Sequence, residues 1–457
     1  MPGPLPSLLR PLHSDEFLPV PPHRALAQAT DAVDRAMPGI TRALGIDPAA
    51  YAHDRRATVL ALRELDAAHG GGYYDLDETA VHDAAAARVA FRSLGPVVDV
   101  QTHLVDPVLW RGPHAAALGH FLRMVDPERW PAAVDPHAID AAAWAALVFG
   151  ASETAVALLT STPGPVGENV LENAQIAAVR DVTDRYSGSG HVLTHTIVHP
   201  NLGPGELDRM VEWSSALGPS AWKVYTLAGP PTAASPSGGW FLDDAEIGTP
   251  FLERVAALGP RIVCAHKGLG GPVPDASVAA ASPRDIGPAA AAFPDIDFVV
   301  YHSGYERDPD GAEGAFDPIA ARGVDRLVAS ARAHGIGPGG NVWAELGSTW
   351  FLVLRRPVEA AHVLGKLVRQ FGPERILWGT DSTWYGSPQP LIDAFRAFTI
   401  PERMQAEFGY SPLTDAVKTR ILGTNAAALY GIAPPAPNPP SADLAPALLA
   451  AMDAARS

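Results

Sequence analysis

Cysteine is nearly absent from this sequence, since Cys264 is the only one in 457 residues. A single cysteine cannot form an intramolecular disulfide, and it cannot supply the cluster of thiolates that structural zinc and iron–sulfur sites require. We therefore expect a chain that folds without disulfides and works in a reducing compartment, the cytoplasm.

Long hydrophobic runs are missing as well. The first residues, MPGPLPSLLRPLHSDE, have no basic segment followed by an apolar one, so they do not resemble a secretion signal. No later stretch approaches the roughly 18 uncharged apolar residues that a transmembrane helix needs. The sequence predicts neither secretion nor a membrane anchor.

Positive charge is in short supply. The chain has 34 Lys and Arg residues against 50 Asp and Glu residues, which gives a formal net charge of −16. An acidic surface repels nucleic acid and anionic membranes, so we expect neither as a partner. It does not prevent the binding of a small anion at one local site.

Hydrophobic residues are abundant, making up 47% of the chain, and they predict a large core. From residue 96 to residue 432, short runs rich in Val, Ile, Leu and aromatic residues alternate with stretches of helical period. Near-continuous apolar runs are typical of parallel strands that helices cover on both faces. The eight predicted strands are 96–101, 154–159, 191–198, 221–226, 261–265, 297–301, 341–346 and 375–379.

This alternation predicts an α/β protein built on a TIM (β/α)8 barrel. An open doubly wound sheet is the alternative, although no Gly-rich dinucleotide-binding fingerprint follows the first strand. We expect three regions: a helical N-terminal extension (1–95), the barrel (96–432) and a Pro/Ala-rich tail (433–457). Helices are predicted at 25–37 and 57–69 in the extension, at 168–185, 318–334 and 357–371 around the barrel, and at 442–455 in the tail.

Polar residues gather at the predicted carboxyl ends of the strands, which form the functional face of a βα barrel. Alternation places Gln101 and His103 on one side of the first strand. His266 follows the fifth strand, His302 the sixth and Asp381 the eighth. Imidazole nitrogens and carboxylate oxygens suit zinc and similar divalent ions. Any one of these histidines alone would be interpreted as structural, but their convergence predicts a mononuclear catalytic site.

The order of these residues within a TIM barrel resembles the amidohydrolase superfamily. The resemblance is to its amidohydrolase-related branch, which holds aminocarboxymuconate-semialdehyde decarboxylase, related aromatic-acid decarboxylases and lactonases. Residues 423–430, GTNAAALY, are similar to the final helix of that branch. The resemblance implies one divalent metal ion, zinc or else manganese, held by His103, His266 and Asp381. It implies acid/base catalysis by His302, with Asp381 as a second proton acceptor.

Gln101 departs from the family pattern, because most members have a histidine at this position and some decarboxylases have Glu. A Gln side-chain oxygen is a neutral and weaker ligand than imidazole. Three alternatives stay open. Gln101 coordinates the metal through its oxygen, or three ligands suffice, or the protein works without a metal, as some lactonases of the branch are thought to do.

Two reactions fit such a site. A metal-activated water, with Asp381 or His302 accepting its proton, would hydrolyse an ester, lactone or amide bond of a small carboxylated substrate. The same ion could instead hold an aromatic or unsaturated carboxylic acid during non-oxidative decarboxylation. A metal-free lactonase and a metabolite-binding barrel without turnover are further alternatives.

Two lysines are candidates for binding the substrate. Lys223 and Tyr225 share one side of the fourth strand, and Lys267 directly follows the fifth-strand histidine. Lys is almost never buried without a partner, so Lys223 either binds a substrate carboxylate or forms an ion pair with Glu345 or Asp99.

Two further residues are expected near the substrate. Glu345, on the seventh strand, either orients the catalytic His302 or Lys223 or serves as a structural partner. Trp384, in the loop after the eighth strand, either covers a substrate ring or packs its own loop. Members of the branch are often homo-oligomers, so the resemblance implies that this chain could form one.

Overall fold

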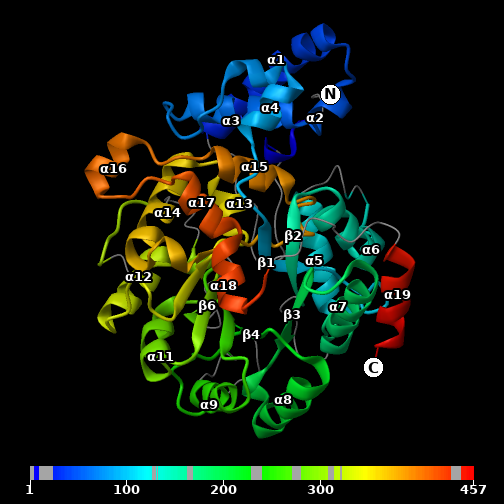
Figure 1. The fold of residues 1–457 in the computed structure, drawn as a ribbon, viewed down its shortest axis with the longest axis vertical. Coiled ribbons are helices and arrows are strands. Elements are labelled where there is room, and N and C mark those ends of the chain that lie inside the picture. Colours follow the sequence, from blue (N-terminus) through cyan, green and yellow to red (C-terminus); the bar gives the residue numbers. More distant parts are fainter. Residues whose placement is uncertain are drawn as a thin grey trace.

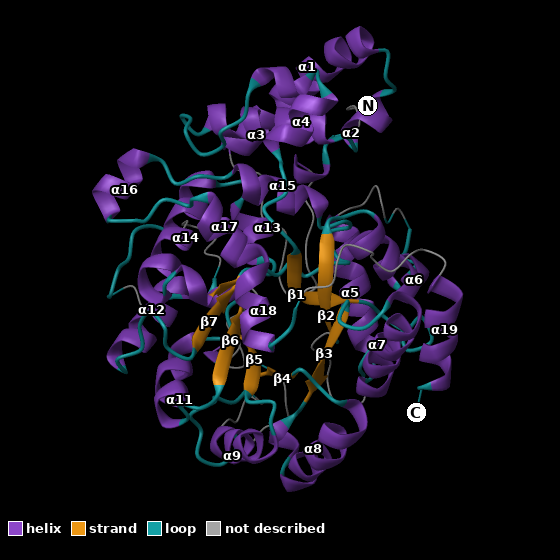
Figure 2. Cartoon of the chain, in the orientation of Figure 1, coloured by secondary structure: helices purple, strands orange, loops and turns teal. Residues whose placement is uncertain are grey.

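The computed structural model describes residues 5–9, 24–125, 130, 132–161, 168–227, 239–269, 279–306, 313–319, 322–433 and 444–456. Its centre is a sheet of eight parallel strands, in which each strand pairs with the next one in the sequence (Figure 2). The strands are β1 (Val97–His103), β2 (Thr154–Thr160), β3 (Val192–Ile197), β4 (Ala221–Tyr225), β5 (Ile262–His266), β6 (Asp297–Tyr301), β7 (Val342–Glu345) and β8 (Ile376–Leu377). All eight predicted strands are confirmed.

The sheet closes into a barrel between β8 and β1. Val100 N donates to Trp378 O at 3.0 Å, and Asp381 N donates to Gln101 O at 2.9 Å. A parallel bridge joins Thr102 to Ser382 beyond these contacts. The predicted TIM barrel is therefore confirmed, and the open doubly wound sheet was the wrong alternative, because the first and last strands are bonded to each other.

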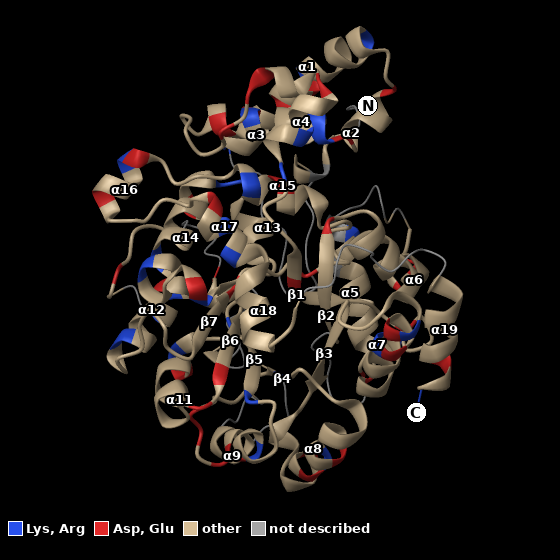
Figure 3. Cartoon of the chain, in the orientation of Figure 1, with Lys and Arg blue, Asp and Glu red and all other residues tan. Residues whose placement is uncertain are grey.

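Helices cover the outside of the barrel (Figure 1). Every residue of β1, β2, β4 and β5 is buried, which explains the near-continuous apolar runs in the sequence. Lys, Arg, Asp and Glu lie mostly on the outer helices (Figure 3). The helices that follow β1 are α5 (Gly112–Val125), α6 (Ala141–Trp144), α7 (Asn173–Ser187), α8 (Pro204–Leu217), α9 (Gly248–Leu258), α11 (Ile286–Ala292), α12 (Gly323–Ala333), α13 (Thr349–Val353), α14 (Pro357–Phe371), α15 (Gln389–Ala397), α16 (Glu402–Phe408), α17 (Asp415–Thr419), α18 (Asn425–Tyr430) and α19 (Ala445–Ala454).

The three predicted covering helices are present, but their ends were predicted with different accuracy. The helix predicted at 357–371 matches α14 to the residue, because Pro357 favours the first helical position. Helix α7 begins at Asn173, later than predicted, because Glu172 and Gln175 form a capping box there. Helix α12 begins only at Gly323, where the backbone leaves the extended conformation of Arg322. Residues 320–321 of that predicted helix lie outside the described residues.

The segment before β1 is helical, as predicted. It contains α1 (Arg24–Leu44), α2 (Pro48–Ala52), α3 (Arg55–Ala68) and α4 (Ala84–Ala90), which gather at one end of the molecule beside α15 (Figure 1). Arg55 Nε pairs with Asp393 Oδ2 of α15 at 2.9 Å, and Tyr74 OH donates to Leu354 O at 2.6 Å. The extension is thus packed against the barrel.

The predicted tail helix is α19, which packs on α7 and α6 at the outside of the barrel (Figure 1). Arg456 pairs with both carboxylate oxygens of Asp106, at 2.7 and 3.0 Å. The proline-rich stretch 434–441 lies outside the described residues. In the part of the chain that the structure describes, no helix has the length and apolar character that crossing a bilayer requires.

Candidate active site

Three of the residues expected at the metal site meet where β1 and β8 end. His103 Nε2 lies 2.9 Å from Asp381 Oδ1, and Gln101 Nε2 lies 3.1 Å from the same oxygen. Gln101 Nε2 is also 3.4 Å from His103 Nε2. All three side chains are buried. Closure of the barrel brings them together, because Gln101 and His103 lie on β1 and Asp381 follows its neighbour β8.

The protonation of His103 follows from its second contact. Its Nδ1 lies 3.1 Å from Thr160 O, and a carbonyl oxygen can only accept, so Nδ1 carries the proton. In a neutral imidazole, Nε2 then has a lone pair, and this lone pair faces the Asp381 carboxylate. Two acceptors at 2.9 Å repel each other unless both share a proton or a cation. The pair is therefore arranged to bind a positive charge.

Gln101 can add an oxygen ligand to this pair. Its Oε1 is buried and has no hydrogen-bond partner among the described residues. Half a turn of the amide would exchange Oε1 and Nε2, two atoms that are nearly indistinguishable in shape. Oε1 would then face the same point as His103 Nε2 and Asp381 Oδ1. One nitrogen and two oxygens form a donor set that suits zinc or manganese.

Asp381 is held from its other side. The Ser348 hydroxyl donates to Asp381 Oδ2 and lies 2.8 Å from Tyr385 OH. Only Oδ1 is thus turned toward Gln101 and His103. Ser348, just after β7, was missed in the sequence analysis, and its place after a strand is the signal that could have found it.

His266 and His302 form a second group at the ends of β5 and β6. His302 Nδ1 donates to Gly347 O at 2.7 Å, so a neutral His302 has its lone pair on Nε2. His266 Nδ1 lies 3.2 Å from that nitrogen and must donate to it. His266 therefore keeps its own lone pair on Nε2, the atom that could serve as a further metal ligand.

The expected ligand set is thus divided between two groups. No three His, Cys, Asp or Glu side chains come close enough to hold a metal ion in the described part of the chain. His103 and Asp381 lie together, whereas His266 contacts His302. The role of His266 as a metal ligand stays a prediction.

Two buried carboxyl groups lie beneath the site. Burial raises the pKa of Asp99 to about 8, although Thr380 and the Gln101 amide donate to it. Burial likewise raises the pKa of Glu345 to about 7, although it accepts from the His302 and Gly347 amides. Glu345 thus accepts from the backbone amide of His302, and its role in orienting that residue stays a prediction.

Lys223 lies in the barrel interior against aromatic rings. Its Nζ is 3.1 Å from the centroid of the Tyr301 ring and 4.7 Å from that of Tyr225. Tyr225 donates its hydroxyl to Ser161 O at 3.0 Å, and its ring lies 5.4 Å from that of His266. The predicted substrate lysine is therefore next to the second histidine group.

The structure gives Lys267 a different environment from the one expected. Its Nζ is fully buried and pairs with Asp285 Oδ2 at 2.7 Å, and it donates to Ala280 O at 3.0 Å. Alternation along β5 turns His266 inward and the next residue away from it. We therefore assign Lys267 to a structural ion pair and omit it from the site.

Trp384 forms one wall of the site. Its ring is stacked on that of His103, with a centroid distance of 5.6 Å and an interplanar angle of 23°. The side chain is buried, and its indole nitrogen has no partner among the described residues. This position fits a cover over the first group as well as packing of the loop.

Backbone strain is concentrated at this face of the barrel. The non-glycine residues with positive φ in the described segments are Leu269, His302, Ser303, Ser348 and Asp381. Each follows one of the strands β5 to β8. Conformations of this kind persist where the surrounding structure enforces them, and they cluster at functional sites.

Gly347 has no side chain, and the side chains of Gln101 and Glu345 fill the space beside it. A Cβ at this position would lie closer than 3.0 Å to Gln101 Oε1 and to Glu345 Oε1. We expect Gly347→Ala to lower the free energy of unfolding by about 1–3 kcal/mol, because both buried side chains must move. Urea unfolding measures this change. Gly337→Ala is the control, since nothing lies within 4 Å of its Cβ; equal stabilities of the two variants would contradict the prediction.

Comparison with known proteins adds a family match. A family model described as Amidohydrolase matches residues 20–432, a range that includes much of the N-terminal extension. No curated protein matches the sequence.

Solved structures resemble the chain at low identity. 2,6-Dihydroxybenzoate decarboxylase from Rhizobium is 13% identical, with 74% of this chain and 98% of that chain covered and a TM-score of 0.44. 5-Carboxyvanillate decarboxylase from Novosphingobium aromaticivorans, complexed with manganese, is 12% identical, with 74% and 96% covered and a TM-score of 0.45. An amidohydrolase from Burkholderia multivorans with bound zinc is 16% identical, with 74% and 100% covered and a TM-score of 0.42.

Proposed function

The chain belongs to the amidohydrolase family, and from this premise we propose that it is a metal-dependent hydrolase. Its substrate would be a small carboxylated molecule with an ester, lactone or amide bond. The observation that carries the proposal is the distance of 2.9 Å between His103 Nε2 and Asp381 Oδ1, with the other ring nitrogen of His103 already bound to Thr160 O.

The metal would be held by His103 Nε2, Asp381 Oδ1 and the Gln101 side-chain oxygen, with His266 Nε2 as a further ligand. A divalent ion bound there, zinc or manganese, supplies Lewis-acid polarisation of a substrate oxygen or of water. Thr160 O fixes the tautomer of His103, and Ser348 fixes the orientation of Asp381. Such supporting contacts are typical of metal sites, where they orient the ligands.

The two histidines of the second group handle protons. His302 Nδ1 is committed to Gly347 O, so only Nε2 can exchange a proton. His266 Nδ1 and His302 Nε2 share one proton across 3.2 Å. His302 would act as the acid when a second proton makes it an imidazolium: its Nε2 would then deliver that proton to the leaving group and return to the neutral form, while the Asp381 carboxylate accepts a proton from the attacking water.

The substrate carboxylate would be bound by Lys223. Its ammonium group is buried beside the rings of Tyr225 and Tyr301, where a charge–charge contact is weakly screened. Trp384 closes the opposite wall over His103 and keeps water from the first group.

Non-oxidative decarboxylation is the second candidate, and the aromatic walls favour it. Tyr225 and Tyr301 lie against a buried ammonium group and Trp384 lies against His103, and these aromatic side chains suit an aromatic carboxylic acid. In that reaction, His302 in its imidazolium form would deliver its Nε2 proton to carbon as carbon dioxide leaves, and would return to the neutral form.

Elemental analysis followed by a substrate screen tests the proposal. Protein purified without chelators or a nickel-bearing tag is expected to contain about one zinc or manganese ion per chain. Esters, lactones, amides and aromatic carboxylic acids are then assayed with that metal present. Release of an alcohol or amine supports hydrolysis, and release of carbon dioxide supports the second candidate. Protein that contains no metal and gains none on addition would contradict the metal-dependent proposal.

A further inference from the structure

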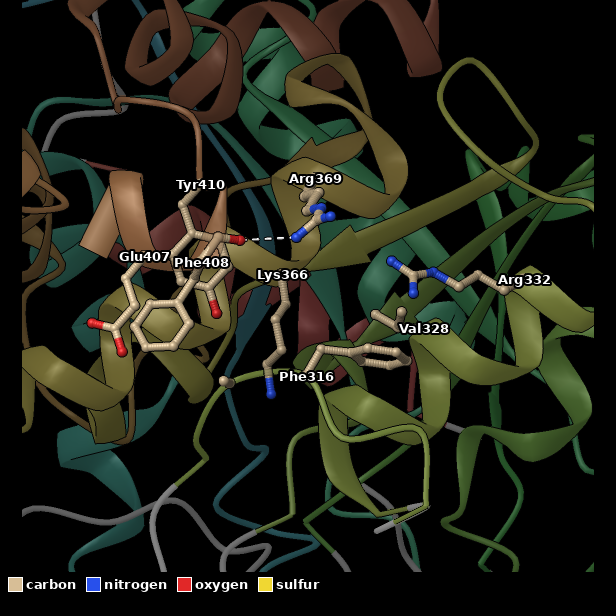
Figure 4. Close-up of a pocket in the computed structure, with 9 residues that line it drawn as sticks. Phe316, Val328, Arg332, Lys366, Arg369, Glu407, Phe408 and Tyr410 are labelled. Carbon is tan, nitrogen blue, oxygen red and sulfur yellow. Dashed lines mark hydrogen bonds between the residues drawn. The ribbon is translucent and has the colours of Figure 1, made fainter. Parts of the chain in front are cut away.

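A second cavity lies outside the barrel, between α12, α14 and the end of α16 (Figure 4). Its volume is about 270 Å³, which suits a ligand with a single ring. None of its lining residues belongs to the site at the strand ends. The residues that matter here are Phe316, Arg332, Lys366, Arg369, Phe408 and Tyr410.

The floor of the cavity is a buried lysine that two carboxylates hold. Lys366 Nζ pairs with Glu313 Oε2 at 2.5 Å and with Asp325 Oδ1 at 2.7 Å. The ammonium group is thus held in place, and the three groups together carry one formal negative charge.

Two exposed arginines add positive charge to the lining of the cavity. Arg332 Nε donates to Gln370 Oε1 at 2.7 Å, and Arg369 Nη1 donates to Phe408 O at 2.8 Å. Neither guanidinium has a carboxylate at ion-pair distance among the described residues. In Figure 4 the two groups face the same space from different sides, and the Glu407 carboxylate lies beyond the Phe408 ring. In a chain with 50 acidic and 34 basic residues, two such arginines mark a local site for an anion.

Aromatic side chains form the walls. Arg332 Cζ lies 4.4 Å from the centroid of the Phe316 ring. The Phe408 ring is fixed between Tyr410, with a centroid distance of 5.6 Å, and His362, at 4.8 Å. Tyr410 OH is bound in turn to His362 Nδ1 at 2.9 Å. These walls are held in place before any ligand binds, and they favour a planar ring.

We propose that this cavity is a second ligand site, specific for a small aromatic carboxylate. The carboxylate would be bound by the guanidinium groups of Arg332 and Arg369, which match its two oxygens. The ring would lie against Phe316 and Phe408. This proposal does not depend on the reaction at the strand ends.

Calorimetric titration with benzoate tests the site. The double variant R332Q/R369Q is expected to bind benzoate at this cavity at least about tenfold more weakly than the wild type, because both charge-assisted contacts are lost. The matched control R42Q/R185Q removes the same charge from α1 and α7 and is expected to bind within twofold of the wild type. Melting temperatures check that both variants fold.

Two comparisons separate the proposal from other forms of binding. Acetate lacks the ring and benzyl alcohol lacks the charge, so both are expected to bind more weakly than benzoate. Inorganic phosphate that binds as well as benzoate would overturn the aromatic specificity. A crystal structure with 4-bromobenzoate locates the bromine. Bromine at the strand ends alone, or equal benzoate affinity in wild type and R332Q/R369Q, would overturn the site.

Discussion

Replacing His103 with alanine is expected to reduce bound zinc or manganese from about one ion per chain to less than about a tenth of that. The reason is the geometry of one nitrogen. Thr160 O accepts from Nδ1, so in the neutral ring Nε2 has the lone pair with which it would bind a metal ion shared with Asp381 Oδ1. Elemental mass spectrometry of the purified variant gives the metal content directly.

The control for this variant is His334→Ala. His334 is exposed and caps the C-terminal end of α12, where its ring bonds to Ser330 O. It is expected to keep the wild-type metal content. Circular dichroism and melting of His103→Ala check the fold, because the variant also loses the contact between His103 and Trp384. Full metal content in a folded His103→Ala protein would contradict the assignment of His103 as a metal ligand.

Gln101 allows a test in the opposite direction. We expect Gln101→His to tighten metal binding by about tenfold or more, because imidazole is a stronger ligand than an amide oxygen. Gln101→Leu is expected to weaken it, since it removes the oxygen altogether. Competition with a chromogenic chelator measures both affinities. Unchanged affinity in both variants would show that Gln101 is not a ligand.

Much of the fold could be predicted because it follows from hydrophobic pattern alone. Strands buried on both faces appear as apolar runs, and a helix such as α14 begins where Pro357 fits its first turn. The position of Gln101, His103 and Asp381 near one another also follows from pattern. Alternation along β1 places Gln101 and His103 on the same side, and barrel closure brings the end of β8, with Asp381, beside them.

The arrangement after the strands could not be predicted in the same way. His302, Ser348 and Asp381 have positive φ angles. Neither the hydrophobic periodicity nor the composition of the sequence predicts this backbone conformation. The contacts of His302 depend on the carbonyl of Gly347, and the orientation of Asp381 depends on Ser348. The contact between His266 and His302 likewise could not be predicted from strand order.

The second large effect is expected at His302. The variant His302→Asn should keep its metal and its fold but lower kcat by about 10² or more, the usual contribution of general acid/base catalysis. Asn cannot bind and release a proton as imidazole does. It is also the substitution that best preserves the backbone, because His302 has a φ of 61° and Asn tolerates this left-handed region.

The choice of Asn separates proton transfer from backbone strain. His302→Ala would remove the imidazole and also place a residue of lower tolerance at positive φ, so loss of activity would have two causes. With Asn, a fall in kcat at unchanged metal content and unchanged melting temperature points to the missing proton. The assay uses whichever substrate the screen identifies, with His334→Asn as the surface control. Turnover equal to that of the wild type would remove His302 from the mechanism and leave Asp381 as the proton acceptor at the strand ends.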